Sequence, residues 1–223
     1  MSGHGAPTMD IDLYNYFRSS SSYRVRIAMH LKGLEYRYLP VHLNRNGGEQ
    51  FTPAFRSMSP HAVVPVLSTG GVHLVQSLAI LEWLEETHPQ PPLLPKSAQA
   101  RAQVRALCLT IACEIHPLTN LRVLKYLTGP LGASEEAKQQ WIHHWTEGGL
   151  AAVEAMLKAG AGGRFCYGDA PGMADCCLVP QVFNAERFGV DMAAYPNVCR
   201  IANACNELPA FQRAHPSRQP DAE

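Results

Sequence analysis

Four consecutive serines, Ser19 to Ser22, stand between a short apolar segment and an amphipathic one. Arg18 precedes them, and residues 23–32 have the apolar spacing of a helix. Serine is a poor residue inside a helix and a good one at its start. The hydroxyl groups are therefore expected where free backbone N–H groups point out of a helix, a favourable place for an anion. A helix cap with more serines than it needs is the alternative interpretation.

Two nearby features favour the anion site. Pro65, after Val64, opens an apolar segment that resembles a strand, and proline is tolerated there only at a sheet edge or in a special turn. Ser77, which follows Gln76, is placed to cap a second helix with a regular apolar face. Three separate segments thus carry backbone or hydroxyl groups suited to one polar ligand.

The first part of the chain alternates strand and helix patterns and predicts an α/β domain. The expected elements are strand 11–16, helix 21–32, strand 35–42, a short helix near 51–57, strands near 65–68 and 72–75, and helix 77–87. In order they form a βαβ unit followed by a ββα unit. Four prolines within residues 89–95 then end the last helix and predict a stiff linker over residues 89–97.

After the linker, the apolar pattern predicts only helices, over 98–127, 134–158, from about 172, and over 197–206. Pro117 lies inside the first of them and should bend it. Trp141 and Trp145 share one stripe of the second and are expected in the core. The domain organisation expected is a flexible tail over 1–9, an α/β domain over 10–88, the linker, and an all-α domain over 98–223.

Composition and charge exclude several classes of function. Lys and Arg together number 19, as do Asp and Glu, so no basic surplus favours nucleic acid or a membrane surface. No apolar run is long enough to cross a bilayer and residues 1–8 lack a signal peptide, so a cytoplasmic location is expected. Seven cysteines without a C-x-x-C pair favour free thiols, and the ten histidines lack metal-ligand spacing, so no metal is expected.

The chain resembles the zeta class of glutathione transferases, the class of the maleylacetoacetate and maleylpyruvate isomerases. The resemblance covers essentially residues 11–221. It depends on these motifs in order: Arg18 to Ser22 with Arg24 to Ala28, Val64-Pro65, Gln76-Ser77, Ile115-His116-Pro117 with Asn120, Ala174-Asp175 with Leu178 to Val182, Ala185 to Phe188, and Gln219-Pro220-Asp221. It implies a thioredoxin-like N-terminal domain, an all-helical C-terminal domain, glutathione as cofactor and a homodimer.

The resemblance also implies a cis peptide bond before Pro65 and roles for individual residues. The residues expected to bind glutathione are Ser19, Ser20, Ser21, Gln50, Val64, Pro65, Gln76, Ser77, His116 and Asn120. Ser19 is expected to hold the sulfur, with Ser20 and Ser21 as alternatives. Arg18, Arg122 and Arg187 are expected to bind a maleyl diacid, while Arg24 and Arg26 are expected to be mainly structural. The usual Ser-Ser-Cys of the family ends in Ser21 here. Its usual Thr-x-x-Asp cap begins with Gly172, and because glycine is an acceptable N-cap, Asp175 is expected to remain structural.

We therefore expect a glutathione-dependent cis–trans isomerase that acts on maleylacetoacetate or maleylpyruvate in the degradation of aromatic compounds. Adding a thiolate to a conjugated double bond turns it briefly into a single bond, which can rotate. A helix N-terminus and a serine hydroxyl would favour the thiolate. A conjugating or dehalogenating transferase of small haloacids would use the same thiolate, and a non-catalytic binding module on this fold is a third alternative.

Overall fold

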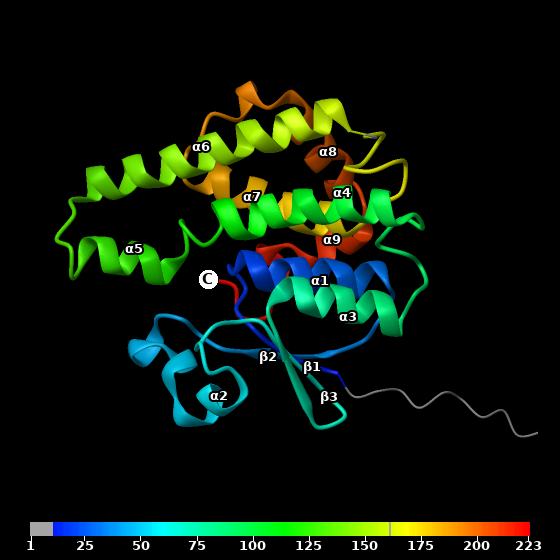
Figure 1. Ribbon diagram of the computed structural model, residues 1–223. Helices are drawn as coiled ribbons and strands as arrows, with labels where there is room; N and C mark the ends of the chain where they lie inside the picture. Colours follow the sequence, from blue (N-terminus) through cyan, green and yellow to red (C-terminus); the bar gives the residue numbers. More distant parts are fainter. Residues whose placement is uncertain (1–10, 161) are drawn as a thin grey trace, which may run out of the picture.

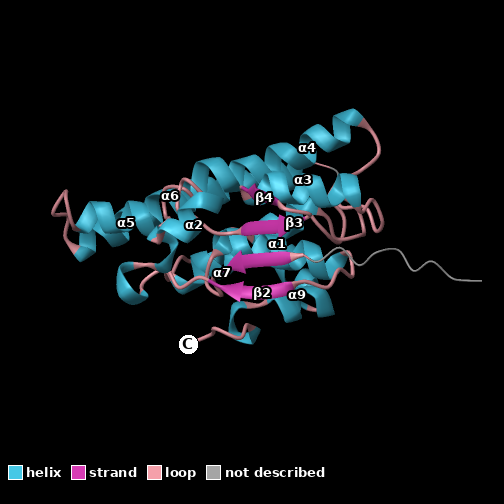
Figure 2. Ribbon diagram, turned by 90° about the horizontal axis from the view of Figure 1, so that it is seen from below, coloured by secondary structure: helices cyan, strands magenta, loops and turns pink. Residues whose placement is uncertain are grey.

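The structure of the protein is a computed structural model that describes residues 11–160 and 162–223. The tail expected over 1–9 lies outside these residues. The N-terminal part contains the strands β1 (Asp12–Asn15), β2 (Arg37–Pro40), β3 (Val66–Thr69) and β4 (Val72–Val75). They form one sheet in the order β2–β1–β3–β4, with β2 parallel to β1 and the other pairs antiparallel (Figure 2).

The helices of this part are α1 (Ser20–Leu31), α2 (Pro53–Met58) and α3 (Ser77–Thr87). Figure 1 shows α1 and α3 side by side over one face of the sheet. The sheet face beneath them is apolar, since Leu13 of β1 and Leu67 of β3 are paired and fully buried. The expected order of βαβ followed by ββα is thus confirmed, and the fold is thioredoxin-like.

The C-terminal part lies on the far side of α1 and α3 from the sheet (Figure 1). Its helices are α4 (Ala98–Leu109), α5 (Leu121–Thr128), α6 (Glu135–Ala159), α7 (Met173–Arg187), α8 (Pro196–Asn206) and α9 (Pro209–Ala214). The expected fold class, an α/β domain followed by a helical one, is confirmed. The short helix α9 was not expected from the sequence.

The prediction of a single helix over residues 98–127 is wrong. After α4 the chain makes a wider π-helical turn over Thr110–Ile115 and then leaves the helix before α5 begins. Pro117 explains part of this break, because it has no N–H to donate and its ring clashes with the preceding turn. Asn120 then starts α5 afresh, since its side-chain oxygen accepts a hydrogen bond from the Arg122 amide at 3.1 Å. The break brings His116 and Asn120 beside residues of the sheet-containing part, with which they line common cavities.

One apolar core joins the two parts, because α1 packs between the sheet and the helices α7 and α9. Helix α7 is buried on almost every side. Its start is fixed by Asp175, whose carboxylate accepts hydrogen bonds from the amides of Gly172 at 2.8 Å and Cys166 at 2.9 Å. The predicted cap with Gly172 in place of threonine, and the structural role of Asp175, are confirmed.

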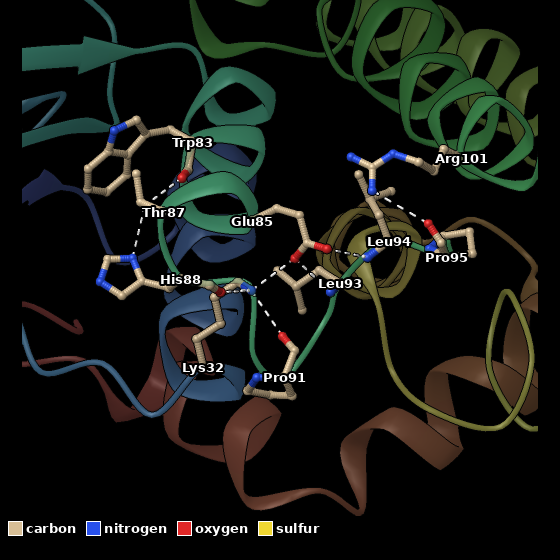
Figure 3. Close-up of polar contacts among 10 residues, drawn as sticks. All are labelled: Lys32, Trp83, Glu85, Thr87, His88, Pro91, Leu93, Leu94, Pro95 and Arg101. Atoms are coloured by element: carbon tan, nitrogen blue, oxygen red, sulfur yellow. Dashed lines mark hydrogen bonds and ion pairs between the residues drawn. The ribbon is translucent and has the colours of Figure 1, made fainter. Parts of the chain in front are cut away.

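A buried ion pair fixes the proline-rich linker, as Figure 3 shows. The ammonium group of Lys32 at the end of α1 lies 2.9 Å from the carboxylate of Glu85 in α3, and both side chains are almost fully buried. Lys32 also donates to the carbonyl oxygen of Pro91 at 3.0 Å, and Glu85 accepts from the amide of Leu93 at 2.8 Å. The pair therefore ties both helices to the linker.

The expectation that Trp141 and Trp145 lie in the core is wrong. Trp145 is 36% exposed, and Trp141 is half-buried with its indole N–H donating to the Leu118 carbonyl at 2.7 Å. Their rings pack together, 5.6 Å apart, on the hairpin of α5 and α6. In the ranges that the structure describes, no helix combines the length and the apolar composition needed to cross a membrane.

Candidate functional site

A cleft between the two parts contains three adjoining cavities. The α3 cavity, about 310 Å³, lies at the start of α3 and includes Ser77. The α7 cavity, about 140 Å³, includes Arg187 at the end of α7. Between them is the central cavity, about 110 Å³. Asn120 lines all three, and Ser19 lines the central and α7 cavities, so the three form one continuous site.

Ser19 begins α1, as the sequence predicts. Its side-chain oxygen accepts a hydrogen bond from the Ser22 amide at 3.2 Å. The same oxygen lies 3.3 Å from the hydroxyl of Ser21, which donates in turn to the carbonyl of Val64 at 3.3 Å. Because Ser21 gives its one proton to Val64, the Ser19 hydroxyl donates to Ser21 in the ligand-free protein and can turn its proton to an anion that enters the cleft. Ser20 is buried and lines only the α7 cavity of the three.

The start of α3 differs from the expectation for Ser77. The N-cap is Gln76, with a positive φ of 69°, and Ser77 is the first helical residue. The hydroxyl oxygen of Ser77 accepts a hydrogen bond from the guanidinium of Arg24 at 3.2 Å, so it does not cap the helix. A positive φ costs a non-glycine residue about 1–3 kcal/mol, and residues held in this way cluster at ligand sites.

Arg24, expected to be mainly structural, lies in the wall of the site. Its side chain is 2% exposed, and it lines the α3 cavity. Its Nη1 atom donates to Ser77, whereas its Nε and Nη2 atoms have no hydrogen-bond partner within the described part of the chain. A buried cation without an anion is costly, so the cavity is suited to a carboxylate. The available signal was its spacing, because Arg24 lies one helical turn after Ser20 and Ser21.

Arg26, in contrast, is structural as expected. It is fully buried and donates to the side chain of Asn15 and to the carbonyl oxygens of Tyr16, Phe17 and Ala214. All of its contacts are with the protein itself. The two arginines of one helix therefore have different surroundings, although they are two residues apart.

The central cavity receives the expected residues Gln50 and Val64. The Val64–Pro65 peptide bond is cis, as the family resemblance implies. Gln50 is buried and donates from its amide nitrogen to the carbonyl of Leu43 at 3.3 Å. Its amide oxygen has no partner among the residues described. This oxygen is available to a donor from a bound ligand.

His116 and Asn120 lie on the break between α4 and α5. His116 lines both the α3 and the α7 cavity. Burial, and then the nearby cations Arg24 and Arg122, lower the pKa of His116 to about 3 from its ordinary value of 6.5. The imidazole is therefore neutral at physiological pH and can both donate and accept a hydrogen bond.

The three arginines expected to bind substrate do not all meet. Arg18 and Arg187 both line the α7 cavity, whereas Arg122 lines the other two cavities. Arg187 donates to the side chain of Asn184 at 3.1 Å, and its guanidinium lies 4.4 Å from the centre of the Phe188 ring. Partial burial, followed by the charge of Arg18, lowers the pKa of Arg187 from its ordinary value. Two cations thus face the same small cavity.

Neither a disulfide nor a metal cluster contributes to the site. All seven cysteines are free, and Cys113 is the one that lines the α3 cavity. Among the residues that the structure describes, no group of histidine, cysteine, aspartate or glutamate side chains could hold a metal ion. Cavity-lining hydroxyl, amide and guanidinium groups are suited instead to an anionic peptide beside a small anion.

Comparison with known proteins agrees with this description. The N-terminal domain model of glutathione S-transferases matches residues 13–92, and the C-terminal domain model matches residues 139–199. The chain is 50% identical to a maleylacetoacetate isomerase of Pseudomonas aeruginosa, over 94% of this chain and 97% of that protein. It is 48% identical to a maleylpyruvate isomerase of a Ralstonia species, over 94% and 99% of the two chains.

The chain is also similar to a solved structure in both sequence and fold. The maleylacetoacetate isomerase of Anaeromyxobacter dehalogenans, crystallised with glutathione bound in its active site, superposes with a TM-score of 0.87. The two chains are 46% identical, and the match covers 97% of this chain and 99% of the other.

Proposed function

The chain belongs to the glutathione S-transferase family, in its zeta class, and we propose that it isomerises maleylacetoacetate or maleylpyruvate to the fumaryl isomer with glutathione as cofactor. The observation that carries this function is the position of Ser19, which lines two cavities. One of them continues into the α3 cavity with its buried cation, and the other contains two arginines. A thiol held at Ser19 would therefore face a pocket for a small diacid.

The described residues fit glutathione. Arg24 and Ser77 supply donors for a carboxylate at one end of the site, and Gln76 begins α3 beside them. The free amide oxygen of Gln50 and the backbone of Val64 are placed for the peptide groups. When bound, glutathione supplies a thiolate that adds reversibly to a conjugated double bond and so permits rotation about it.

The protein's own part is to stabilise that thiolate. Ser19 can donate its hydroxyl proton to the sulfur anion while it accepts from the Ser22 amide. The start of α1 adds the positive end of a helix dipole. Both contributions favour the charged form over the neutral thiol, whose ordinary pKa is about 8.5. Ser21 supports the arrangement through its contact with Ser19 and its hydrogen bond to Val64.

Arg18 and Arg187 would bind the carboxylates of the substrate. Guanidinium groups bind carboxylates through two parallel hydrogen bonds and stay charged throughout the physiological range. They also favour the negative charge that develops on the substrate as the double bond is lost. Arg122, which lines the central cavity, is placed nearer to glutathione than the other two. His116, neutral and between the cavities, can hydrogen-bond to either ligand.

We also propose that the protein has two domains with separate roles. Residues 10–88 would form the glutathione-binding domain, and residues 98–223 the substrate domain, joined by the linker 89–97. A homodimer agrees with the zeta-class resemblance, and a cytoplasmic location agrees with the seven free cysteines. Sedimentation velocity would test the dimer, since a monomer would contradict it.

A panel of substrates tests the function against its main alternative. We expect rapid isomerisation of one or both maleyl diacids with glutathione, and much slower conjugation of neutral electrophiles or halide release from small haloacids. The arginine pair favours the diacid, because a broad detoxifying transferase would need an apolar pocket. Faster halide release than isomerisation would assign the chain to the dehalogenating transferases instead.

A further inference from the structure

The C-terminal segment returns to the turn that carries the active-site residues. Figure 1 shows the red C-terminal end of the chain beside the blue start of α1. One carboxylate oxygen of Asp221 accepts a hydrogen bond from the amide of Phe17 at 3.1 Å, across 204 positions of the sequence. The hydroxyl of Tyr38 in β2 donates to the other oxygen. Asp221 thereby joins the C-terminal segment to the β1–α1 turn and to the neighbouring strand.

The carbonyl of Phe17 is held from the opposite direction by Arg26. Its guanidinium donates to that carbonyl at 2.9 Å and to the carbonyl of Ala214 in α9 at 3.1 Å. Both polar groups of the Phe17 backbone are therefore bound by charged side chains. Phe17 itself is only 4% exposed. Charge-assisted hydrogen bonds of this kind are roughly twice as strong as neutral ones, so this part of the turn is rigidly held.

The C-terminal segment is itself anchored. The side-chain amide of Gln219, two residues before Asp221, is buried and donates to the carbonyls of Arg213 at 2.8 Å and His215 at 2.9 Å. Asp221 is consequently held in position by α9 and its C-terminal extension. Its hydrogen bond to the Phe17 amide therefore restrains the turn.

The turn is short, so a change at Phe17 reaches the site at once. The amide of Ser19 donates to the carbonyl of Tyr16 at 3.0 Å, which closes a four-residue turn around Phe17 and Arg18. The Arg18 guanidinium lies 4.9 Å from the centre of the Phe17 ring, and Arg18 and Ser19 both line the α7 cavity. A rotated Phe17 peptide would move both residues together.

We propose that Asp221 is a positioning residue, which sets the orientation of Ser19 and Arg18 through the Phe17 amide. This inference rests on the proposed function for the roles of those two residues. Asp221 lines none of the three cavities, so its effect is on geometry. A displacement of about 1 Å at a catalytic group can reduce activity about a hundredfold.

The test compares Asp221→Asn and Asp221→Ala with a matched control, Glu154→Gln. The carboxylate of Glu154 also accepts backbone hydrogen bonds, from Asn197 at 3.1 Å and Val198 at 3.0 Å at the start of α8, and it lines none of the three cavities. Four quantities are measured: the melting temperature, amide hydrogen exchange of residues 16–19 without ligand, the pKa of the bound glutathione thiol, and kcat and KM for the maleyl diacid.

We expect Asp221→Asn to speed exchange at the Phe17 amide, raise the thiol pKa, and lower kcat/KM about ten- to a hundredfold. Glu154→Gln should lower the melting temperature and leave the other three quantities unchanged. A Tyr38→Phe variant keeps the bond between Phe17 and Asp221. It should change the exchange rate, the thiol pKa and kcat/KM in the same direction as Asp221→Asn, but by less. If Asp221→Ala does not fold, the asparagine and Tyr38 variants still decide the question.

The proposal is overturned if the Asp221 variants lose thermal stability with an unchanged thiol pKa and kcat/KM, as the control should. Asp221 would then stabilise the fold without positioning the site. Failure of the proposed function gives a different result. A wild-type enzyme without isomerase activity would still show whether Asp221 controls exchange at the Phe17 amide and the pKa of the bound thiol.

Discussion

The guanidinium of Arg24 donates a hydrogen bond of 3.2 Å to the hydroxyl oxygen of Ser77 and so connects α1 to the start of α3. The remaining nitrogens of Arg24 are buried beside the α3 cavity without a hydrogen-bond partner among the described residues. Ligand-free protein therefore carries a charge that is only partly compensated. A carboxylate entering the cavity would complete its surroundings.

Arg24→Met should weaken glutathione binding with little loss of stability in the ligand-free protein. Methionine keeps the apolar stem and removes the charge, and a lost hydrogen bond to a charged group costs about 1.5–3 kcal/mol. The KM for glutathione should rise at least about tenfold, and the increase in melting temperature caused by glutathione should shrink. As control, Arg26→Met should destabilise the protein with and without ligand, because it leaves several buried carbonyls unpaired. Equal glutathione binding by wild type and Arg24→Met would contradict this role.

Ser19→Ala should raise the pKa of the bound thiol and slow isomerisation at neutral pH. The sulfur anion would lose one hydrogen bond, worth about 1.5–3 kcal/mol. Thiolate absorbance, titrated with pH, measures the pKa directly. The change also removes a helix cap, which costs about 0.5–2 kcal/mol of stability.

Ser134→Ala separates the two effects of the Ser19 variant. Ser134 caps α6 by accepting from the Ala137 amide at 3.2 Å, the same distance as in the cap of α1, and it lines none of the site's cavities. It should lower stability with no change in the thiol pKa. Ser21→Cys should keep activity, since the family usually has cysteine there. A thiol pKa unaffected by Ser19→Ala would transfer the role to Ser20 or Ser21.

Arg187→Ala and Arg18→Ala should each lower kcat/KM for the maleyl diacid, while the KM for glutathione stays nearly constant. Removing one partner of a desolvated charge pair costs about 2–5 kcal/mol, and the lower end applies to the more exposed of the two cations. Arg122→Ala should cost less, because Arg122 lies outside the α7 cavity. Arg105→Ala is the control, since Arg105 pairs on the surface with Glu82 at 2.6 Å. Full activity in all three site variants would exclude the diacid reading.

Lys32→Met should destabilise the protein strongly without altering the site. It leaves the carboxylate of Glu85 buried without its cation, and breaking a buried pair costs about 3–5 kcal/mol. Urea unfolding at pH 7 measures the loss. The double variant Lys32→Met with Glu85→Leu removes both charges and should recover much of the stability. A double variant no better than the single one would show that the hydrogen bonds to the linker matter more than the charge.

Features governed by local preference could be predicted from the sequence. Ser19 begins α1 as expected, because serine favours helix starts over helix interiors. Asp175 fixes the start of α7 through a bond to Gly172, three residues away. The cis bond before Pro65 followed from the family resemblance. In each case the partners are near in sequence or carried by a specific motif.

Features that depend on distant partners could not be predicted. The sequence suggests Ser77 as a cap, but its hydroxyl binds Arg24, which is 53 residues away. Arg24 and Arg26 look alike in sequence, and only the folded chain shows that one faces a cavity and the other the backbone of a turn. The apolar pattern of a helix continues through residues 98–127, yet Pro117 and the cap at Asn120 interrupt the helix itself.

The reaction is expected to depend on glutathione without consuming it. The most direct measurement follows both maleyl diacids spectrophotometrically with dialysed enzyme, with and without glutathione, and then assays free glutathione after many turnovers. We predict conversion to the fumaryl isomer only with glutathione, a rate that saturates with its concentration, and full recovery of the thiol. An equal rate without added thiol, or the loss of one glutathione per turnover, would contradict this mechanism.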